Sequence, residues 1–198
     1  MRRWEIINLL IEKYDLKSYL EIGVFKGDNF NRIRCDLKHS VDPNFPATFE
    51  MTSDEFFMIN CPQVEMMYYD LIFIDGLHTE EQTYKDLANA LFLLAAGGII
   101  VVHDCNPLTE WHTRPPEEYK RGEEWNGTTY KGFIRFVHDH CDGLHTLTID
   151  SDYGVGIIFT QNLGTPKREP ITWDYFDQHR TELLNLVSVD KFTNLLSV

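Results

Sequence analysis

SYLEIGV at residues 18–24 is a short apolar run that closes on a glycine. Two later stretches have the same design: DLIFID at residues 70–75 ends in an acid, and IIVVHD at residues 99–104 ends in a histidine and an acid. Runs that are apolar on both faces are typical of parallel strands covered by helices. The three stretches therefore predict the central strands of an open parallel sheet.

Helical periodicity fills the intervals between these strands, and strands alternating with helices predict a sheet with helices on both faces. The helices that we expect lie at residues 3–13, 28–36, 53–57, 80–94 and 131–140, the fourth being ended by Gly97 and Gly98. Two last strands at residues 144–149 and 155–160 should form an antiparallel hairpin through residues 151–154. Residues 171–196 return to helical periodicity.

Length and composition favour one domain over residues 1–198, with 43% hydrophobic residues. The formal charge of −13 disfavours nucleic acid and anionic membranes as partners, because both recruit clustered Lys and Arg. Cys35, Cys61, Cys105 and Cys141 lie far apart without a C-x-x-C pair, which predicts reduced thiols in a cytosol. We expect no export signal and no membrane span.

The first candidate site follows the first strand, where Glu21, Gly23 and Gly27 precede a strand at residues 39–41 that ends at Asp42. Glycines allow a tight turn and close approach of a ligand, and an acid about 20 residues further on can accept both hydroxyls of a ribose. Together they favour an adenosine ligand. The alternatives are a plain strand-to-helix turn for the glycines and an Asx-turn or cap before Pro43 for the acid.

The second candidate site combines Asp75 and His78 with His103 and Asp104, which follow two neighbouring strands. Two carboxylates and two imidazoles at one rim suit a divalent cation or acid–base chemistry. The alternative is structural: His78 caps the helix that begins near Glu80, and His103 bonds to the backbone.

Residues 106–128 form a polar, tryptophan-containing stretch that is longer than an ordinary connection. We expect a lid or substrate loop there, with a surface loop or an oligomer contact as the alternative. Trp173, Tyr175 and Phe176 in the tail are typical of a core or a dimer interface.

Five blocks then follow one another in order: EIGVFKG at 21–27, SVDPN at 40–44, TSDEFF at 52–57, IDGLHTEEQ at 74–82 and GGIIVVHDCNP at 97–107. Over about residues 17–140 the chain resembles class I S-adenosylmethionine-dependent methyltransferases of the small family, similar to methyltransferase domain 24, that includes macrolide-sugar O-methyltransferases. The resemblance implies a Rossmann-like three-layer α/β/α sandwich with a mostly parallel seven-stranded sheet and an antiparallel terminal hairpin.

The same resemblance implies roles for individual residues. Glu21, Gly23 and Gly27 should line the methionine half of S-adenosylmethionine, Asp42 should hold the ribose, and Ser53 and Asp54 should lie near the adenine, with Asp75 also at the cofactor. Asp75 and Asp104 should hold magnesium, with His78 as general base. The chain has His103 where relatives have a carboxylate, and because magnesium prefers hard oxygens, manganese or no metal stays open.

The expected function is therefore methyl transfer from S-adenosylmethionine to an oxygen of a small acceptor, such as a sugar or a glycosylated metabolite, by a homodimer. Two rivals are an NAD-dependent oxidoreductase and a non-catalytic nucleotide-binding protein. The three residues between Gly23 and Gly27 count against the first, since dinucleotide enzymes use G-x-G-x-x-G. The presence of both the glycine turn and the strand-end acids counts against the second.

Overall fold

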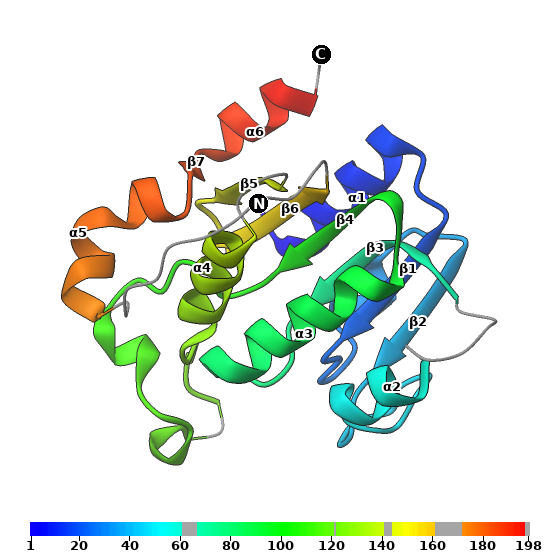
Figure 1. The fold of residues 1–198 in the computed structure, drawn as a ribbon, viewed down its shortest axis with the longest axis horizontal. Coiled ribbons are helices and arrows are strands. Elements are labelled where there is room, and N and C mark those ends of the chain that lie inside the picture. Colours follow the sequence, from blue (N-terminus) through cyan, green and yellow to red (C-terminus); the bar gives the residue numbers. More distant parts are fainter. Residues whose placement is uncertain (61–66, 121, 141–143, 161–171, 197–198) are drawn as a thin grey trace.

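One seven-stranded sheet organises the chain, whose computed structural model describes residues 1–60, 67–120, 122–140, 144–160 and 172–196. Its strand order is β2-β1-β3-β4-β6-β5-β7 (Figure 1). The strands are β1 (Ser18–Ile22), β2 (Leu37–Val41), β3 (Tyr69–Ile74), β4 (Leu94–Val102), β5 (Leu144–Ile149), β6 (Val155–Thr160) and β7 (Leu186–Val187). Cys61, Cys141 and position 171, where the last helical stretch was expected to begin, lie outside the described residues.

Helices cover both faces of the sheet, which confirms the predicted three-layer sandwich. The helices are α1 (Arg3–Tyr14), α2 (Ser53–Asn60), α3 (Glu80–Leu93), α4 (Thr129–Asp139), α5 (Trp173–Leu183) and α6 (Val189–Leu196). One buried cluster joins α1 and α6 to the sheet, and a second joins α2, α3, α4 and α5 to its other face. Figure 1 shows α3 and α4 in front of the sheet and α1 behind it.

The carboxyl ends of four neighbouring strands are level with one another. Ile22 of β1 pairs with Val41 of β2 and with Ile74 of β3, and Ile74 pairs with Val102 of β4. The next residues along each strand, Gly23, Asp42, Asp75 and His103, therefore emerge side by side at one edge of the sheet. All four were named from the sequence as site residues, and the register explains why they meet.

Among the strands described, β6 alone runs against its neighbours, β4 and β5. The hairpin of β5 and β6 turns through residues 151–154, as predicted. β7 then pairs in parallel with β5 at the edge of the sheet. The mostly parallel sheet with an antiparallel terminal hairpin is thus confirmed.

The prediction of a helix at residues 28–36 is wrong. The segment forms only a short 3₁₀ turn, Phe30–Arg32. Side chains from elsewhere take the backbone groups that an α-helix would pair internally. Asn8 of α1 donates its amide to the carbonyl of Arg32 (2.9 Å) and accepts from the N–H of Arg34 (2.8 Å). The segment therefore connects β1 to β2 beside α1 without a full helix of its own.

The junction of α3 and β4 also differs from the prediction. α3 ends at Leu93, and β4 begins at once at Leu94, so that Gly97 and Gly98 lie within the strand instead of ending the helix. The pairing of β3 with β4 shifts register between Tyr69 and Leu71, opposite this part of β4. The irregular pairing accommodates Gly97, whose φ is +77°.

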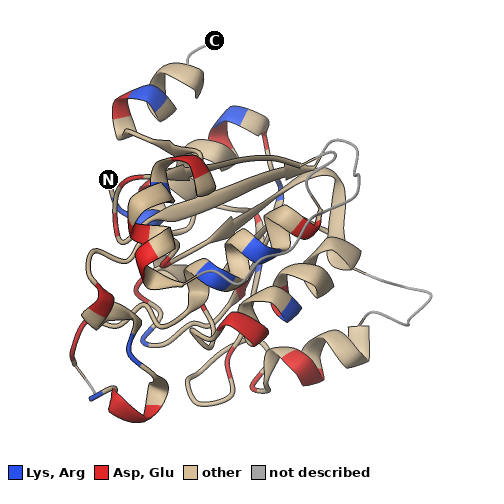
Figure 2. Cartoon of the chain, turned by 60° about the vertical axis from the view of Figure 1, so that its left-hand side comes forward, with Lys and Arg blue, Asp and Glu red and all other residues tan. Residues whose placement is uncertain are grey.

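None of the helices in the described ranges has both the length and the apolar character needed to cross a membrane. Basic and acidic side chains are interspersed along the helices and loops in Figure 2. The 31 acidic residues outnumber the 18 basic ones.

Candidate active site

A cavity of about 850 Å³ lies at the edge where the four level strands end. It is large enough for a ligand of nucleoside size or more. Its walls come from the turns after β1, β2, β3 and β4, from the start of α1 and α2, from the loop that precedes α4, and from the β5–β6 turn. Both candidate sites predicted from the sequence thus open into the same cavity.

Gly23 forms the floor of the turn after β1. Its φ is +87°, and a Cβ atom at this position would meet the carbonyl oxygen of Asp75 at 2.0 Å. Only glycine fits there, because both the backbone conformation and the contact exclude a side chain. Gly27, with φ +78°, closes the turn by donating its N–H to the carbonyl of Val24 (2.9 Å), but it does not line the cavity.

Glu21 lies behind the glycine turn and outside the cavity lining. Its carboxylate is 1% exposed and accepts hydrogen bonds from Tyr19 Oη (2.5 Å) and Asn29 Nδ2 (2.8 Å). Burial raises the pKa of Glu21 to about 7, although both hydrogen bonds favour the ionised form. In this structure Glu21 supports the turn from below, whereas the sequence predicted it beside the ligand.

Asp42 joins the turns that follow β1 and β2. Its Oδ2 accepts from the backbone N–H groups of Val24 (2.9 Å) and Phe25 (3.1 Å). Its Oδ1 accepts from those of Asn44 (2.8 Å) and Phe45 (3.0 Å), which is the Asx-turn that the sequence offered as an alternative. Asp42 also lines the cavity, so the carboxylate that holds the turns borders the space open to a ligand.

Ser53 and Asp54 begin α2 and line the cavity beyond Asp42. Gln82 of α3 holds both of them, since its Nε2 lies 3.1 Å from Ser53 Oγ and 3.0 Å from Asp54 Oδ1. The same nitrogen lies 2.9 Å from Asp86, whose burial raises its pKa to about 6. Gln82, which sequence reasoning missed as a site residue, fixes α2 against α3 at this end of the cavity.

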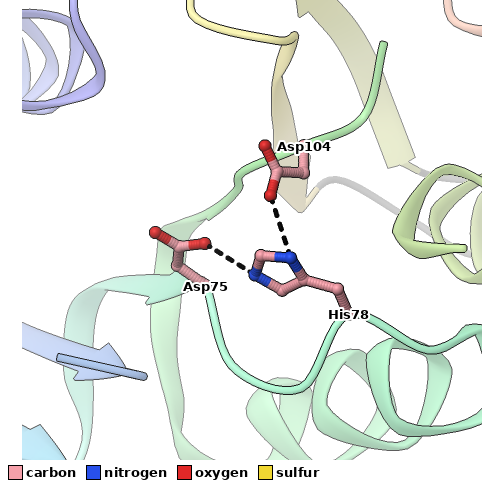
Figure 3. Close-up of side chains that lie close together, drawn as sticks. All are labelled: Asp75, His78 and Asp104. Carbon is pink, nitrogen blue, oxygen red and sulfur yellow. Dashed lines mark ion pairs between the residues drawn. The ribbon is translucent and has the colours of Figure 1, made fainter. Parts of the chain in front are cut away.

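Asp75, His78 and Asp104 gather at the other end of the cavity (Figure 3). The two ring nitrogens of His78 each face a carboxylate: Nε2 lies 3.3 Å from Asp75 Oδ1, and Nδ1 lies 3.1 Å from Asp104 Oδ2. One ligand atom from each of the three residues lies within 4.8 Å of the others, a spacing that suits a divalent cation. We call these three residues the carboxylate–imidazole cluster.

His103 completes the surroundings of this cluster. Its Nδ1 lies 3.3 Å from Asp75 Oδ1 and 3.0 Å from Asp104 Oδ1, so its ring faces carboxylates and not the backbone. On the other side, His103 Nε2 lies 3.6 Å from Asp152 of the β5–β6 turn and 3.2 Å from Arg3 Nη1 of α1. Arg3 and Asp152 were not predicted as site residues.

Charge pairing sets the protonation of the cluster. Burial lowers the pKa of His78, but Asp104 and Asp75 outweigh burial and raise that pKa above its usual value. Burial raises the pKa of Asp75, but the positive charge of His103 dominates and holds it well below the usual range. Both shifts favour imidazolium–carboxylate pairs in the water-poor end of the cavity.

The loop before α4 is fastened to His78. The carbonyl of His78 accepts from Thr128 N (2.9 Å), and a Cβ atom at Gly127 would meet that carbonyl at 2.0 Å. Trp125 stacks on the His78 ring (5.2 Å between centroids), and Tyr119 stacks on Trp125 (5.1 Å). The loop at 106–128 therefore builds one wall of the cavity, except that position 121 lies outside the described residues.

The structural alternative for His78 does not hold. The N-cap of α3 is Thr79, whose side chain accepts from Gln82 N (3.3 Å), and the first helical N–H, of Glu80, donates to Thr128 Oγ1 (2.7 Å). The His78 ring therefore does not cap α3, and it points into the cavity between Asp75 and Asp104 (Figure 3).

Residues with strained backbone conformations lie around the same cavity. Six non-glycine residues of the described ranges have a positive φ, and four of them line it: Phe25 (+49°), Asp104 (+60°), Asp152 (+51°) and Tyr153 (+62°). Such conformations cost free energy and persist where the surrounding structure requires them, commonly at functional sites. The arrangement offers a turn for a nucleoside-like ligand at one end and groups for proton transfer or cation binding at the other.

Comparison with known proteins gives a domain match over part of the chain and a shared fold. Residues 20–105 match a family of methyltransferase domains. The structure resembles an O-methyltransferase from Bacillus cereus in complex with SAH, at 14% identity and a TM-score of 0.53, over 81% of this chain and 80% of that one.

Two further solved structures are similar at the same level. The O-methyltransferase TomG from Streptomyces achromogenes, in complex with SAM, has 14% identity and a TM-score of 0.54 over 81% of this chain and 80% of its own. The SAH-bound methyltransferase PaMTH1 from Podospora anserina has 18% identity and a TM-score of 0.51 over 81% and 78%. No curated protein matches the sequence. At these identities the solved structures show a shared fold.

Proposed function

We propose that the chain is a class I S-adenosylmethionine-dependent methyltransferase that methylates an oxygen atom of a small-molecule acceptor, on the support of its domain match over residues 20–105 and its fold. The observation that carries the proposal is the carboxylate–imidazole cluster at one end of the cavity whose other end is the glycine turn. Two similar solved structures are O-methyltransferases, which supports an oxygen acceptor.

We assign the cofactor to the end of the cavity formed by the turns after β1 and β2. Gly23 leaves room for the methionine half, Asp42 receives the ribose hydroxyls, and Ser53 and Asp54 face the adenine. The support is that all four line the cavity, with Gly23 after β1, Asp42 after the neighbouring β2, and Ser53 and Asp54 at the start of α2. Glu21 and Gly27 would act from behind, by holding the shape of the turn.

His78 acts as the general base of the proposed reaction in its neutral form, which the raised pKa of this ring places at pH values above the usual histidine range. The bound cofactor supplies an electrophilic methyl group on a sulfonium centre. A hydroxyl is a poor nucleophile until its proton is removed, and His78 takes this proton as the oxygen forms its bond to the methyl carbon. Asp75 and Asp104 stabilise the imidazolium that results, since each lies within 3.3 Å of one ring nitrogen. The cofactor, when bound, would retain on its sulfur the electron pair of the broken sulfur–carbon bond.

The cluster also fits a divalent cation in its donor atoms. Asp75 and Asp104 would hold it, with magnesium or manganese as the proposed ion and with His103 or His78 as the nitrogen ligand; a His78 ring that binds the ion could not act as the base at the same time. When bound, a cation at this place supplies positive charge that polarises the acceptor hydroxyl. The donor set of two carboxylates and one imidazole favours manganese over magnesium, which prefers oxygen ligands.

The acceptor class that we propose is a sugar or a glycosylated metabolite. Trp125 and Tyr119 provide aromatic surface beside the cluster, and Glu124 and Tyr153 provide hydrogen-bonding groups, as a polyhydroxylated ligand requires. The homodimer and the cytosolic location stay predictions from the sequence.

The experiment that tests this function is incubation with methyl-labelled S-adenosylmethionine and a panel of neutral sugars, glycosides, phenols and amines, with products identified by mass spectrometry. We expect label on a hydroxyl oxygen of a sugar or glycoside. Transfer to amines alone would contradict the oxygen assignment, and transfer to phenols alone would contradict the sugar class.

A further inference from the structure

Arg3 reaches the carboxylate–imidazole cluster from an element that the family match does not include, since that match begins at residue 20. It is the first residue of α1, and the side chains of Ile6, Ile7 and Leu10 in that helix are completely buried against the sheet. The buried stripe fixes the start of α1 at the edge where β3 and β4 end. The guanidinium of Arg3 is thus held in place by a packed helix.

The side chain of Arg3 contacts Asp75 of the cluster and the residues beside it. Its Nη1 donates to Asp152 Oδ2 (3.1 Å), and its backbone N–H donates to the same oxygen (3.0 Å). Its Nε lies 3.6 Å from Asp75 Oδ2 and is buried without a hydrogen-bond partner. The side chain, 23% exposed, therefore faces Asp75, Asp152 and the His103 ring together.

A guanidinium at this distance acts on any cation held by Asp75. Arginine carries a permanent positive charge, and like charges a few ångströms apart in a partly buried site repel strongly. Asp75 contributes an oxygen both to the ion pair with Arg3 and to the candidate cation group. The two cations therefore compete for one carboxylate.

We propose that Arg3 is a positioning residue that acts as the built-in counter-cation of Asp75 and weakens the binding of a divalent cation by the cluster. The inference rests on the proposed cation role of Asp75, His78 and Asp104. It gives α1 a part in the chemistry of the site: Arg3 adds a permanent positive charge beside Asp75, next to the rings of His103 and His78, when no metal is bound.

Arg2 is the matched control. It also lines the cavity and pairs with Asp152, at 2.9 Å from Oδ1, but its side chain is 63% exposed. Among the described residues its guanidinium forms an ion pair with Asp152 and none with Asp75. Replacing Arg2 removes the same charge from the chain while leaving the Asp75–Arg3 pair intact.

The test is titration of the whole protein with Mn²⁺, followed by the electron paramagnetic resonance signal of the free ion, in the wild type, Arg3→Gln, Arg3→Lys and Arg2→Gln. Circular dichroism and thermal unfolding confirm that each variant is folded. We expect Arg3→Gln to raise the Mn²⁺ affinity by about tenfold or more. Arg3→Lys, which keeps the charge, and Arg2→Gln should stay within about twofold of the wild type.

Three results would overturn the inference: unchanged or weaker Mn²⁺ binding by Arg3→Gln, an equal gain in Arg2→Gln, or no Mn²⁺ binding by any variant. If Arg3→Gln fails to fold, Arg3→Ala takes its place in the titration. Equal Mn²⁺ affinity of the wild type and a folded Arg3→Ala protein would then overturn the inference. S-adenosylhomocysteine titration of the same samples separates the two proposals. Its binding to the wild type keeps the proposed function even where the Mn²⁺ result goes against Arg3.

Discussion

Asp42 shows how a single carboxylate can serve both the fold and a ligand. It is 7% exposed, and four backbone N–H groups from two turns already point at its oxygens. A ribose at this place would share acceptor atoms that the turns also use. The ribose assignment and the Asx-turn alternative are therefore compatible, and a substitution separates their contributions.

Asp42→Ala should raise the dissociation constant of S-adenosylhomocysteine by about tenfold or more, since the loss of a charged acceptor costs about 1.5–3 kcal/mol. Isothermal titration measures the change. Asn44→Ala is the control, because it keeps the backbone N–H that donates to Asp42. A dissociation constant unchanged in a folded Asp42→Ala protein would count against the ribose role.

His78→Ala tests the proposed base. Removal of a general base typically costs about 10²–10⁴ in rate. We expect kcat to fall by about a hundredfold or more, while the affinity for S-adenosylhomocysteine stays within about twofold. Steady-state kinetics and titration provide the two numbers. Losses of the same size in both would reassign His78 from catalysis to structure.

Glu21 predicts a pH dependence of stability. Its pKa is about 7 in the folded protein against 4.5 ordinarily, so the folded state binds the extra proton between those values. Stability from this group is complete below pH 4.5 and is lost as the pH rises through 7, by about 3 kcal/mol in total at 1.36 kcal/mol per pH unit.

Glu21→Gln removes this dependence, because glutamine stays neutral and can still accept from Asn29. Denaturant unfolding of both proteins between pH 4.5 and 8 gives the comparison. The wild type should lose stability relative to the variant as the pH rises. Parallel curves for the two proteins would show that Glu21 titrates as an ordinary carboxyl.

At the scale of elements, the loop at 106–128 and the start of α3 behave as one unit, joined at Gly127 and His78. Gly127→Ala should lower both stability and kcat, because the new methyl group would overlap the His78 carbonyl and displace the ring stacked on Trp125.

Gly122→Ala in the same loop is the control. Gly122 also has a positive φ (+97°), but a Cβ atom there meets nothing within 4 Å. Both variants carry backbone strain of about 1–2 kcal/mol, so only Gly127→Ala should lose kcat. Equal kcat in the two variants would mean that the loop does not position His78.

Elements whose pattern is local were predictable from the sequence. The strands ending at Ile22, Ile74 and Val102 are mostly apolar runs, and α3 has a regular stripe between a capping threonine and Leu93. The segment at 28–36 was not predictable in the same way. Its conformation is set by Asn8, about 25 residues earlier in the chain, and no local spacing shows that contact.

Some residues of the candidate site were predictable from local sequence patterns, and others were not. Gly23, Asp42, Asp75 and Asp104 were found because each follows an apolar strand, and parallel strands end at one edge. Arg3 begins α1, which precedes the first strand, so it does not follow an apolar strand as the other residues do. Asp152 lies on a hairpin turn, where an acid is ordinary. Only the packing of α1 and of β6 beside β4 brings these two residues to His103.

For the whole molecule, the level strand ends place a cofactor turn and an acid–base cluster in one cavity. The match to methyltransferase domains over residues 20–105 removes support from the two rivals, the NAD-dependent oxidoreductase and the non-catalytic protein. The net charge of −13 fits an acceptor that is neutral, because anionic acceptors would be repelled on approach.

Isothermal titration of the purified protein with S-adenosylhomocysteine and S-adenosylmethionine, in EDTA and again with Mn²⁺, tests the central claim most directly. We predict a dissociation constant on the order of micromolar for either ligand, which corresponds to a binding free energy of about −8 kcal/mol. In a thermal-unfolding measurement either ligand should stabilise the protein, and NAD should not. Absence of binding by both ligands under all of these conditions would contradict the account and leave the cavity to a different ligand.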